Sequence, residues 1–147
     1  MTESVAEALD RIAGNLRFFD DWADRFQYLI DLGRALPAFP EEWRTEANRM
    51  DGCQAAVWLV AGWRDGRLHA VAASDSVIVA GLVAILLDVF QGRTAREILD
   101  APPDIAAVVG LSEHLSASRR NGLAGMIQRI RNLARTRLDR TPERETP

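Results

Sequence analysis

The segment AAVWLVAGWRDGRLHAVAA, residues 55–73, predicts a β-hairpin. Its first apolar run ends at Trp63, is rich in Val and Trp, and has the length of a buried strand. Asp65-Gly66 is a dipeptide that strongly favours a tight hairpin turn, and residues 68–73 supply the returning strand. We therefore expect a small antiparallel sheet at the middle of the chain.

Helical patterns flank this hairpin on both sides. Capping boxes open helices at Ser4 and Thr94, and Asp20 or Asp21 can cap a second helix. The apolar residues after Ser76 predict a buried helix that ends near Gly92. Further expected elements are an extended segment over 44–50, a short helix within 105–115 and a long helix from Ser116 or Ser118. This order predicts an α+β fold with the sheet packed against helices.

Length and composition fit one ordinary soluble domain. The chain has 147 residues, of which 48% are hydrophobic and 27% charged. We expect a domain over 1–138 and a flexible tail over 139–147. The formal net charge of −3 argues against nucleic-acid and membrane partners. The apolar run 77–87 is too short to span a bilayer, and residues 1–10 lack the basic start of a signal peptide.

Two features of composition limit the chemistry. A single cysteine excludes an internal disulfide, so we expect a reducing, cytoplasmic setting. All 18 basic residues are arginines. Because there is no lysine, this chain cannot form a Schiff base through a lysine, including the attachment of pyridoxal phosphate. A partner must supply the lysine for any such step.

Cys53 lies in Met50-Asp51-Gly52-Cys53-Gln54, directly before the expected central strand. Three interpretations of this thiol remain open: a packing residue, an incidental surface thiol, or a nucleophile that carries a group. Gly52 permits a turn that would present the side chain. Asp51 carries the wrong charge to stabilise a thiolate. The residues alone do not decide among the three.

Other polar residues are weaker candidates. His114 and Arg119 lie near the start of the last helix, where a cation is unfavourable for the helix dipole. The Arg119 guanidinium is therefore a candidate to bind an anion or the thiolate, against the simpler interpretation of an exposed arginine. His69 is expected to face solvent. Cys53 with the two histidines would offer three zinc ligands, but at unrelated spacings.

Several ordered motifs resemble the SufE family of sulfur acceptors for cysteine desulfurases. They run from about Phe19 to Ala134 and include GCQ at 52–54 with Val57-Trp58. The remaining motifs are YLIDLG at 28–33, Leu36-Pro37, Ser74-Asp75, Ile78-Val79, Gly81-Leu82, Leu111, His114-Leu115, Ser118-Arg119 and Gly122-Leu123. The whole series in this order is a specific signature.

The resemblance implies a single SufE- and IscU-type domain in which Cys53 accepts sulfur as a persulfide. The implied partners are a cysteine desulfurase of the SufS or CsdA kind, whose turnover the chain stimulates, and an iron–sulfur scaffold complex that receives the sulfur. Gln54, Asp75, His114 and Arg119 are the supporting residues that it suggests, with no metal and no cofactor. Ala55, Asp51 and Ala80 depart from the usual family pattern, which affects docking and activation of the cysteine rather than the sulfur chemistry.

Two alternatives belong to other classes of protein. A scaffold that binds an iron–sulfur cluster or zinc would need more thiolates than one. A stand-alone thiol enzyme would need His114 within hydrogen-bond reach of Cys53.

Overall fold

The computed structural model describes residues 3–50 and 55–140. Two helices, α1 (Val5–Arg17) and α2 (Trp22–Arg34), come first, and the short 3₁₀ turns η1 (Glu41–Trp43) and η2 (Glu46–Asn48) follow. The hairpin strands are β1 (Val57–Arg64) and β2 (Arg67–Ser74). After them come α3 (Val77–Phe90), α4 (Ala95–Asp100), α5 (Ile105–Val108), η3 (Ser112–His114) and α6 (Ala117–Arg140). The predicted α+β class is confirmed.

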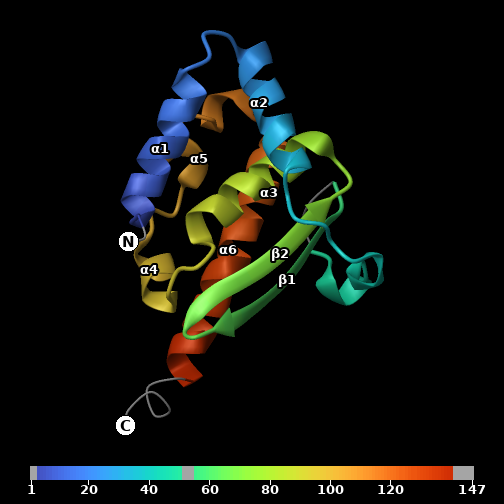
Figure 1. Ribbon diagram of the computed structural model, residues 1–147, viewed down its shortest axis with the longest axis vertical. Coiled ribbons are helices and arrows are strands. Elements are labelled where there is room, and N and C mark those ends of the chain that lie inside the picture. Colours follow the sequence, from blue (N-terminus) through green and yellow to red (C-terminus); the bar gives the residue numbers. More distant parts are fainter. Residues whose placement is uncertain (1–2, 51–54, 141–147) are drawn as a thin grey trace.

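The hairpin forms as the sequence predicts. β1 and β2 pair antiparallel from Val57 opposite Ser74 to Arg64 opposite Arg67. Asp65 and Gly66 close the turn with φ values of 54° and 74°, the left-handed geometry that an Asp-Gly turn supplies. In Figure 1 the two strands run diagonally beside α3 and α6.

The free edge of β2 is covered by the chain that follows α3. The side-chain amide of Gln91 accepts from the Ala70 N–H and donates to the Ala70 carbonyl, both over 2.8 Å. The Gly92 N–H then donates to the Leu68 carbonyl over 2.9 Å. Since an open strand edge invites pairing with other chains, these bonds protect the sheet on that side.

The segment before the hairpin differs from the expectation. Residues 44–50 are not an extended strand, because Thr45 caps the 3₁₀ turn η2 instead. Of residues 44–50, only Arg49 forms a bridge to the sheet, opposite Trp58. Within the described residues the sheet therefore has two strands, and β1 has neighbours on both sides only at Trp58. A threonine cap and a polar segment without alternating apolar residues favour the local turn over a third strand.

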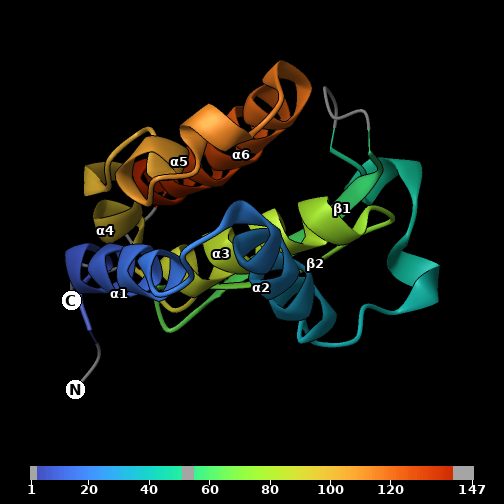
Figure 2. The same cartoon turned by 90° about the horizontal axis from the view of Figure 1, so that it is seen from above.

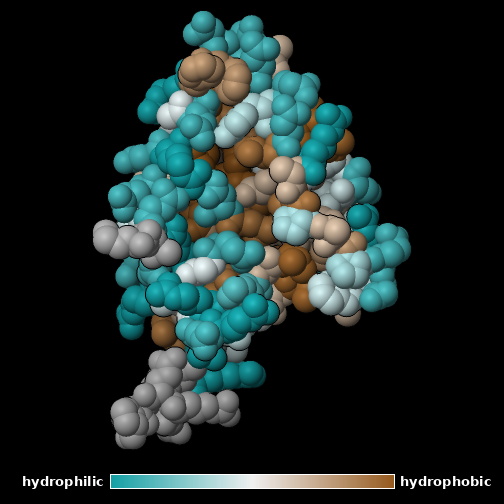
Figure 3. Space-filling model, in the orientation of Figure 1, coloured by the Kyte–Doolittle hydropathy of each residue, from teal (hydrophilic) through white to brown (hydrophobic). Residues whose placement is uncertain are grey.

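Helix α3 is the centre of the core. Nine of its residues are buried, and its apolar character on every face is that of a helix enclosed by other elements. Figure 2 shows α5 and α6 in a layer above α1 and α3. Figure 3 shows apolar residues gathered over the middle of one face, where α3 and the strands lie, inside a polar border.

Helices α2 and α3 cross closely because glycine occupies both sides of the contact. A Cβ atom on Gly81 would lie 2.2 Å from the Leu29 carbonyl oxygen, and one on Gly33 would lie 2.7 Å from the Gly81 nitrogen. No side chain fits at either position. The close crossing holds the first turns of α3 in place against α2, and these turns border the candidate site.

Helix α6 continues to Arg140, two residues past the expected domain limit, and 141–147 lie outside the described residues. Among the helices of the described ranges, none is long and apolar enough to cross a membrane.

Candidate functional site

Cys53 and Gln54 lie outside the described residues, so the site is built from the residues around them. On the N-terminal side, the Met50 N–H donates to the Val57 carbonyl over 2.8 Å. On the C-terminal side, Ala56 is bonded to Ser74 and Asp75 at the end of β2. Both neighbours of the segment that contains Cys53 are therefore attached at the start of β1.

Asp75 holds the C-terminal side. Its Oδ1 accepts from the Ala56 N–H over 3.0 Å, and its own N–H donates to the Ala56 carbonyl over 3.2 Å. The Ser74 hydroxyl donates to the same carbonyl over 2.8 Å. These bonds fasten the backbone three residues after Cys53 to the end of β2. The bonds agree with the predicted role of Asp75 in positioning the cysteine segment, and that role stays a prediction.

A cavity of about 330 Å³ opens beside this anchor. Its floor is apolar and buried, formed by Val79 and Leu82 of α3 and by Leu123 and Met126 of α6. Its rim is polar and more exposed, and Ala55 borders it from the side of β1. The polar residues of the rim are Ser76, Ser116, Ser118 and Arg119.

Two helix N-termini meet at this rim. The Ser76 hydroxyl caps α3 by accepting from the Val79 N–H over 3.4 Å. The Ser116 hydroxyl accepts from the Arg119 N–H over 3.2 Å at the start of α6. Because the N-terminus of a helix carries a partial positive charge, both helices favour a negative group at the rim.

Arg119 adds a full positive charge to this rim. It is exposed, and its guanidinium forms no hydrogen bond or ion pair with another residue of the described ranges. Of the residues predicted from the sequence, Arg119 lines the cavity, and Asp75 bonds Ala56, the chain neighbour of the cavity residue Ala55. The cation in the first turn of α6 lies where it can act on an anion.

His114 lies elsewhere. Its ring stacks on Trp22 of α2 with the ring centroids 3.5 Å apart and the planes 23° apart. It is not among the residues that line the cavity. His69 is exposed on β2, as expected.

The cavity floor is what sequence reasoning missed. Val79, Leu82, Leu123 and Met126 are part of ordinary apolar stripes, and periodicity does not reveal which members of a stripe border a cavity. Ser76 and Ser116 stand out in the sequence as helix caps, and Ser118 as a cap and as part of the family motif Ser118-Arg119. Within residues 3–50 and 55–140, which do not include Cys53, no group of three or more His, Asp or Glu side chains is suited to bind a metal.

An α+β domain with a small antiparallel sheet packed against helices is the arrangement that the family resemblance implies. The family model for SufE, described as an Fe-S metabolism associated domain, matches residues 10–134. This chain belongs to the SufE family.

Relatives agree with that assignment. An uncharacterised SufE-like protein of Rhizobium meliloti is 46% identical over 137 residues, which cover 89% of this chain and 97% of that one. The sulfur acceptor protein CsdE of Escherichia coli is 39% identical over 113 residues, 74% of this chain and 76% of that protein. A solution structure of a hypothetical protein from Thermus thermophilus matches with a TM-score of 0.74 and 20% identity, over 90% of this chain and 96% of that one, and shows the fold alone. Together the family and CsdE assign this chain a sulfur-acceptor role in Fe–S metabolism, and cysteine desulfurases are the general kind of partner with which such proteins act.

Proposed function

We propose that this protein takes sulfane sulfur from a cysteine desulfurase onto Cys53 as a persulfide and passes it to iron–sulfur cluster assembly. One observation carries the proposal: the residues on both sides of the Cys53 segment are fastened at the start of β1, beside an apolar cavity with a positive rim. A carrier needs one thiol in a fixed place, a shelter for the bound sulfur and an environment that favours an anion.

The loading step is a thiol exchange. The Cys53 thiolate attacks the outer sulfur of the desulfurase cysteine persulfide, and a new S–S bond forms at Cys53. The S–S bond on the desulfurase breaks, and its cysteine leaves as a thiolate that takes up a proton. No electrons enter or leave the pair of proteins. The desulfurase supplies the pyridoxal lysine that this chain lacks.

The rim of the cavity supports the thiolate. Ala55 borders the cavity, and Cys53 is two positions earlier in the chain, so their Cα atoms lie about 7 Å apart at most. The N-termini of α3 and α6 and the Arg119 guanidinium all favour negative charge there. These positive groups oppose the effect of Asp51, which on its own disfavours the thiolate.

The floor of the cavity gives the persulfide a shelter. Val79, Leu82, Leu123 and Met126 are each at most 9% exposed, so a sulfur placed against them meets little water. By removing sulfur from the desulfurase, the carrier increases the turnover of that enzyme. We place both steps in the cytoplasm.

The position of His114 favours a carrier over a stand-alone thiol enzyme. A Cys–His enzyme requires the imidazole within hydrogen-bond reach of the thiol. Here the imidazole is stacked on Trp22, and the cavity rim beside Ala55 carries serines and an arginine instead.

The test is to incubate the protein with a cysteine desulfurase and cysteine and to measure intact mass under non-reducing conditions. Wild type should gain the mass of one sulfur atom, and Cys53→Ser should gain none. Alanine release by the desulfurase should rise with wild type only. No gain on wild type, or an equal gain on Cys53→Ser, would overturn the proposal.

A further inference from the structure

The start of α6 supplies most of the polar rim, yet the segment that leads into it has little regular structure. Residues 109–116 lie between α5 and α6, and their only helical turn is the 3₁₀ turn η3. Leu115 is 3% exposed, so its side chain anchors the segment in the core. The remaining contacts that hold the segment come from side chains on its solvent side.

Two side chains make these contacts. The Arg120 guanidinium donates to the Leu115 carbonyl over 2.7 Å and to the Ser112 carbonyl over 3.2 Å. These bonds join η3 to α6 and to no other helix. They therefore do not hold η3 and the start of α6 in place against the rest of the fold. His114 supplies a contact of a different kind, since its ring stacks on Trp22 of α2.

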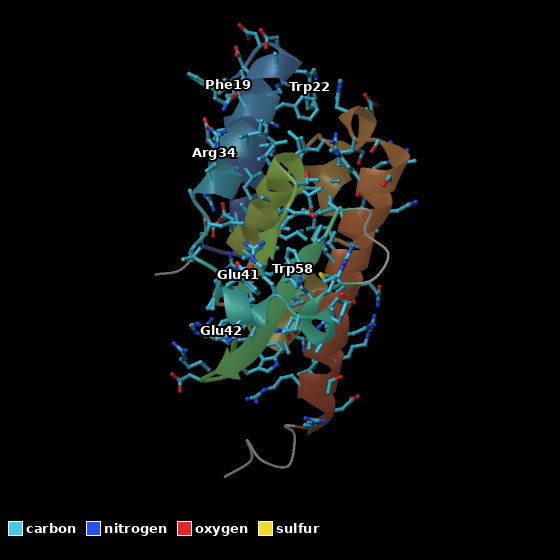
Figure 4. The ribbon with its side chains drawn as sticks, turned by 90° about the vertical axis from the view of Figure 1, so that its right-hand side faces the viewer. Phe19, Trp22, Arg34, Glu41, Glu42 and Trp58 are labelled. Atoms are coloured by element: carbon cyan, nitrogen blue, oxygen red, sulfur yellow. The ribbon has the colours of Figure 1, made fainter. Side chains whose placement is uncertain are left out.

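Trp22 is a well-held platform for that stack. It is the first residue of α2, after the Asp21 cap. Its ring also contacts Phe26, with centroids 5.7 Å apart, and the Arg25 guanidinium, 4.9 Å from the ring centre. Figure 4 shows Trp22 at the end of the molecule where α1 turns into α2.

The stack therefore connects the two helices that line the cavity, α3 and α6. α2 packs closely on α3 through the Gly33–Gly81 crossing, and α3 contributes Val79 and Leu82 to the cavity floor. The other side of the cavity is formed by α6, which begins three residues after His114. Ser116, Ser118 and Arg119 follow His114 by two to five residues and line the cavity, although His114 itself does not.

We propose that His114 is a positioning residue for sulfur transfer: its stack on Trp22 holds the start of α6, and with it Arg119, against the cavity. This inference rests on the proposed carrier function. It assigns His114 an aromatic role and no proton transfer, so a ring without nitrogen atoms should replace it.

The experiment measures single-turnover loading of sulfur onto Cys53 from the desulfurase persulfide, at a series of carrier concentrations. His114→Ala and His114→Gln should lower the maximal loading rate about two- to tenfold, the range that an aromatic contact accounts for, with little change in half-saturating concentration. His114→Phe should restore the rate to within about twofold of wild type, since it keeps a ring for the stack.

A matched control separates this role from stability. Phe19→Ala removes an aromatic contact at the same α1–α2 turn, where the Phe19 and Tyr28 ring centroids are 5.4 Å apart. It should lower the melting temperature and leave loading unchanged. Trp22→Leu should reproduce the loss seen in His114→Ala, and the double variant should lose no more than either single variant.

Three results would overturn the inference: wild-type loading in His114→Ala, a rate as low in His114→Phe as in His114→Ala, or additive losses in the double variant. Failure of the proposed function is distinguishable, because wild type itself would then gain no sulfur. If His114→Ala folds poorly, the comparison of His114→Phe with His114→Gln decides the same question.

Discussion

The carboxylate of Asp75 accepts a hydrogen bond from the Ala56 N–H over 3.0 Å, three residues after Cys53. Together with the bond from Ser74 to the Ala56 carbonyl, it fastens one end of the Cys53 segment to the end of β2. In the proposed function the Cys53 thiol is presented to two partners in turn, and this anchor is the fixed point three residues away from it.

Removing the anchor should loosen the start of β1 without unfolding the protein. Asp75→Ala takes away a charged acceptor from the Ala56 N–H and should cost about 1 kcal/mol locally. We expect hydrogen exchange of the Ala56 amide to become about fivefold faster and alkylation of Cys53 to change. Asp75→Asn keeps an acceptor oxygen and should have a smaller effect. Unchanged exchange in Asp75→Ala would mean that the bond does not hold the segment.

Arg119 should lower the pH at which Cys53 reacts. A cation near a thiol favours the thiolate, so Arg119→Gln should move the midpoint of the Cys53 alkylation profile upward by about half a unit to one unit. Arg140→Gln is the matched control, because it neutralises an arginine at the far end of the same 24-residue helix. If both variants move the alkylation midpoint equally, the cause is the net charge of the protein and not the nearness of Arg119 to the thiol.

The close crossing of α2 and α3 predicts a sharp dependence on glycine. In Gly81→Ala the new Cβ would lie 2.2 Å from the Leu29 carbonyl oxygen, which is backbone and cannot swing aside. We expect a loss of about 3 kcal/mol in the free energy of unfolding, read from the urea midpoint. Gly14→Ala has open space in α1 and should be neutral or stabilise by up to about 1 kcal/mol. If the two variants have similar free energies of unfolding, the close contact of α2 with α3 at Gly81 is contradicted.

The acid limb of stability should depend on Glu97. Its bond from the Thr94 N–H, and then the hydroxyl of Thr94 and the charges of Arg93 and Arg67, hold the pKa of this carboxyl below its usual value of 4.5. A lowered pKa in the folded state stabilises the fold above the unfolded pKa, and this contribution is lost as the pH falls through the folded pKa. Wild type should therefore exceed Glu97→Gln in stability at neutral pH, and the gap should narrow below about pH 4.5. A gap that is constant with pH, measured by denaturation across the range, would contradict this.

Much of the fold follows from local sequence signals. The hairpin was predictable because Asp65-Gly66 joins two apolar runs, and the helices because Ser4, Asp21, Thr94 and Ser116 accept from backbone N–H groups as caps do. The turn at η2 was not, because Thr45 caps it in a segment with weak periodicity.

Contacts between distant segments were the harder part. Arg93 is only 6% exposed, and its guanidinium bonds the carbonyls of Val89, Glu3 and Ser4. A single arginine after a helix gives no sign of such burial. The site shows the same limit, since Asp75 and Arg119 stood out in the sequence while the cavity floor and the partner of His114 depend on tertiary packing. Local patterns do not encode which distant surfaces meet.

The most direct test of the account locates the transferred sulfur within the chain. The protein is loaded by a desulfurase with cysteine that carries radioactive sulfur, blocked by alkylation without reduction, and cut with trypsin. Because the chain has no lysine, cleavage at Arg49 and Arg64 releases the peptide Met50–Arg64, which contains the only cysteine. The account predicts label on this peptide, stoichiometric with protein and removed by a reductant. Label that stays on the desulfurase, or that survives in Cys53→Ser, would contradict it.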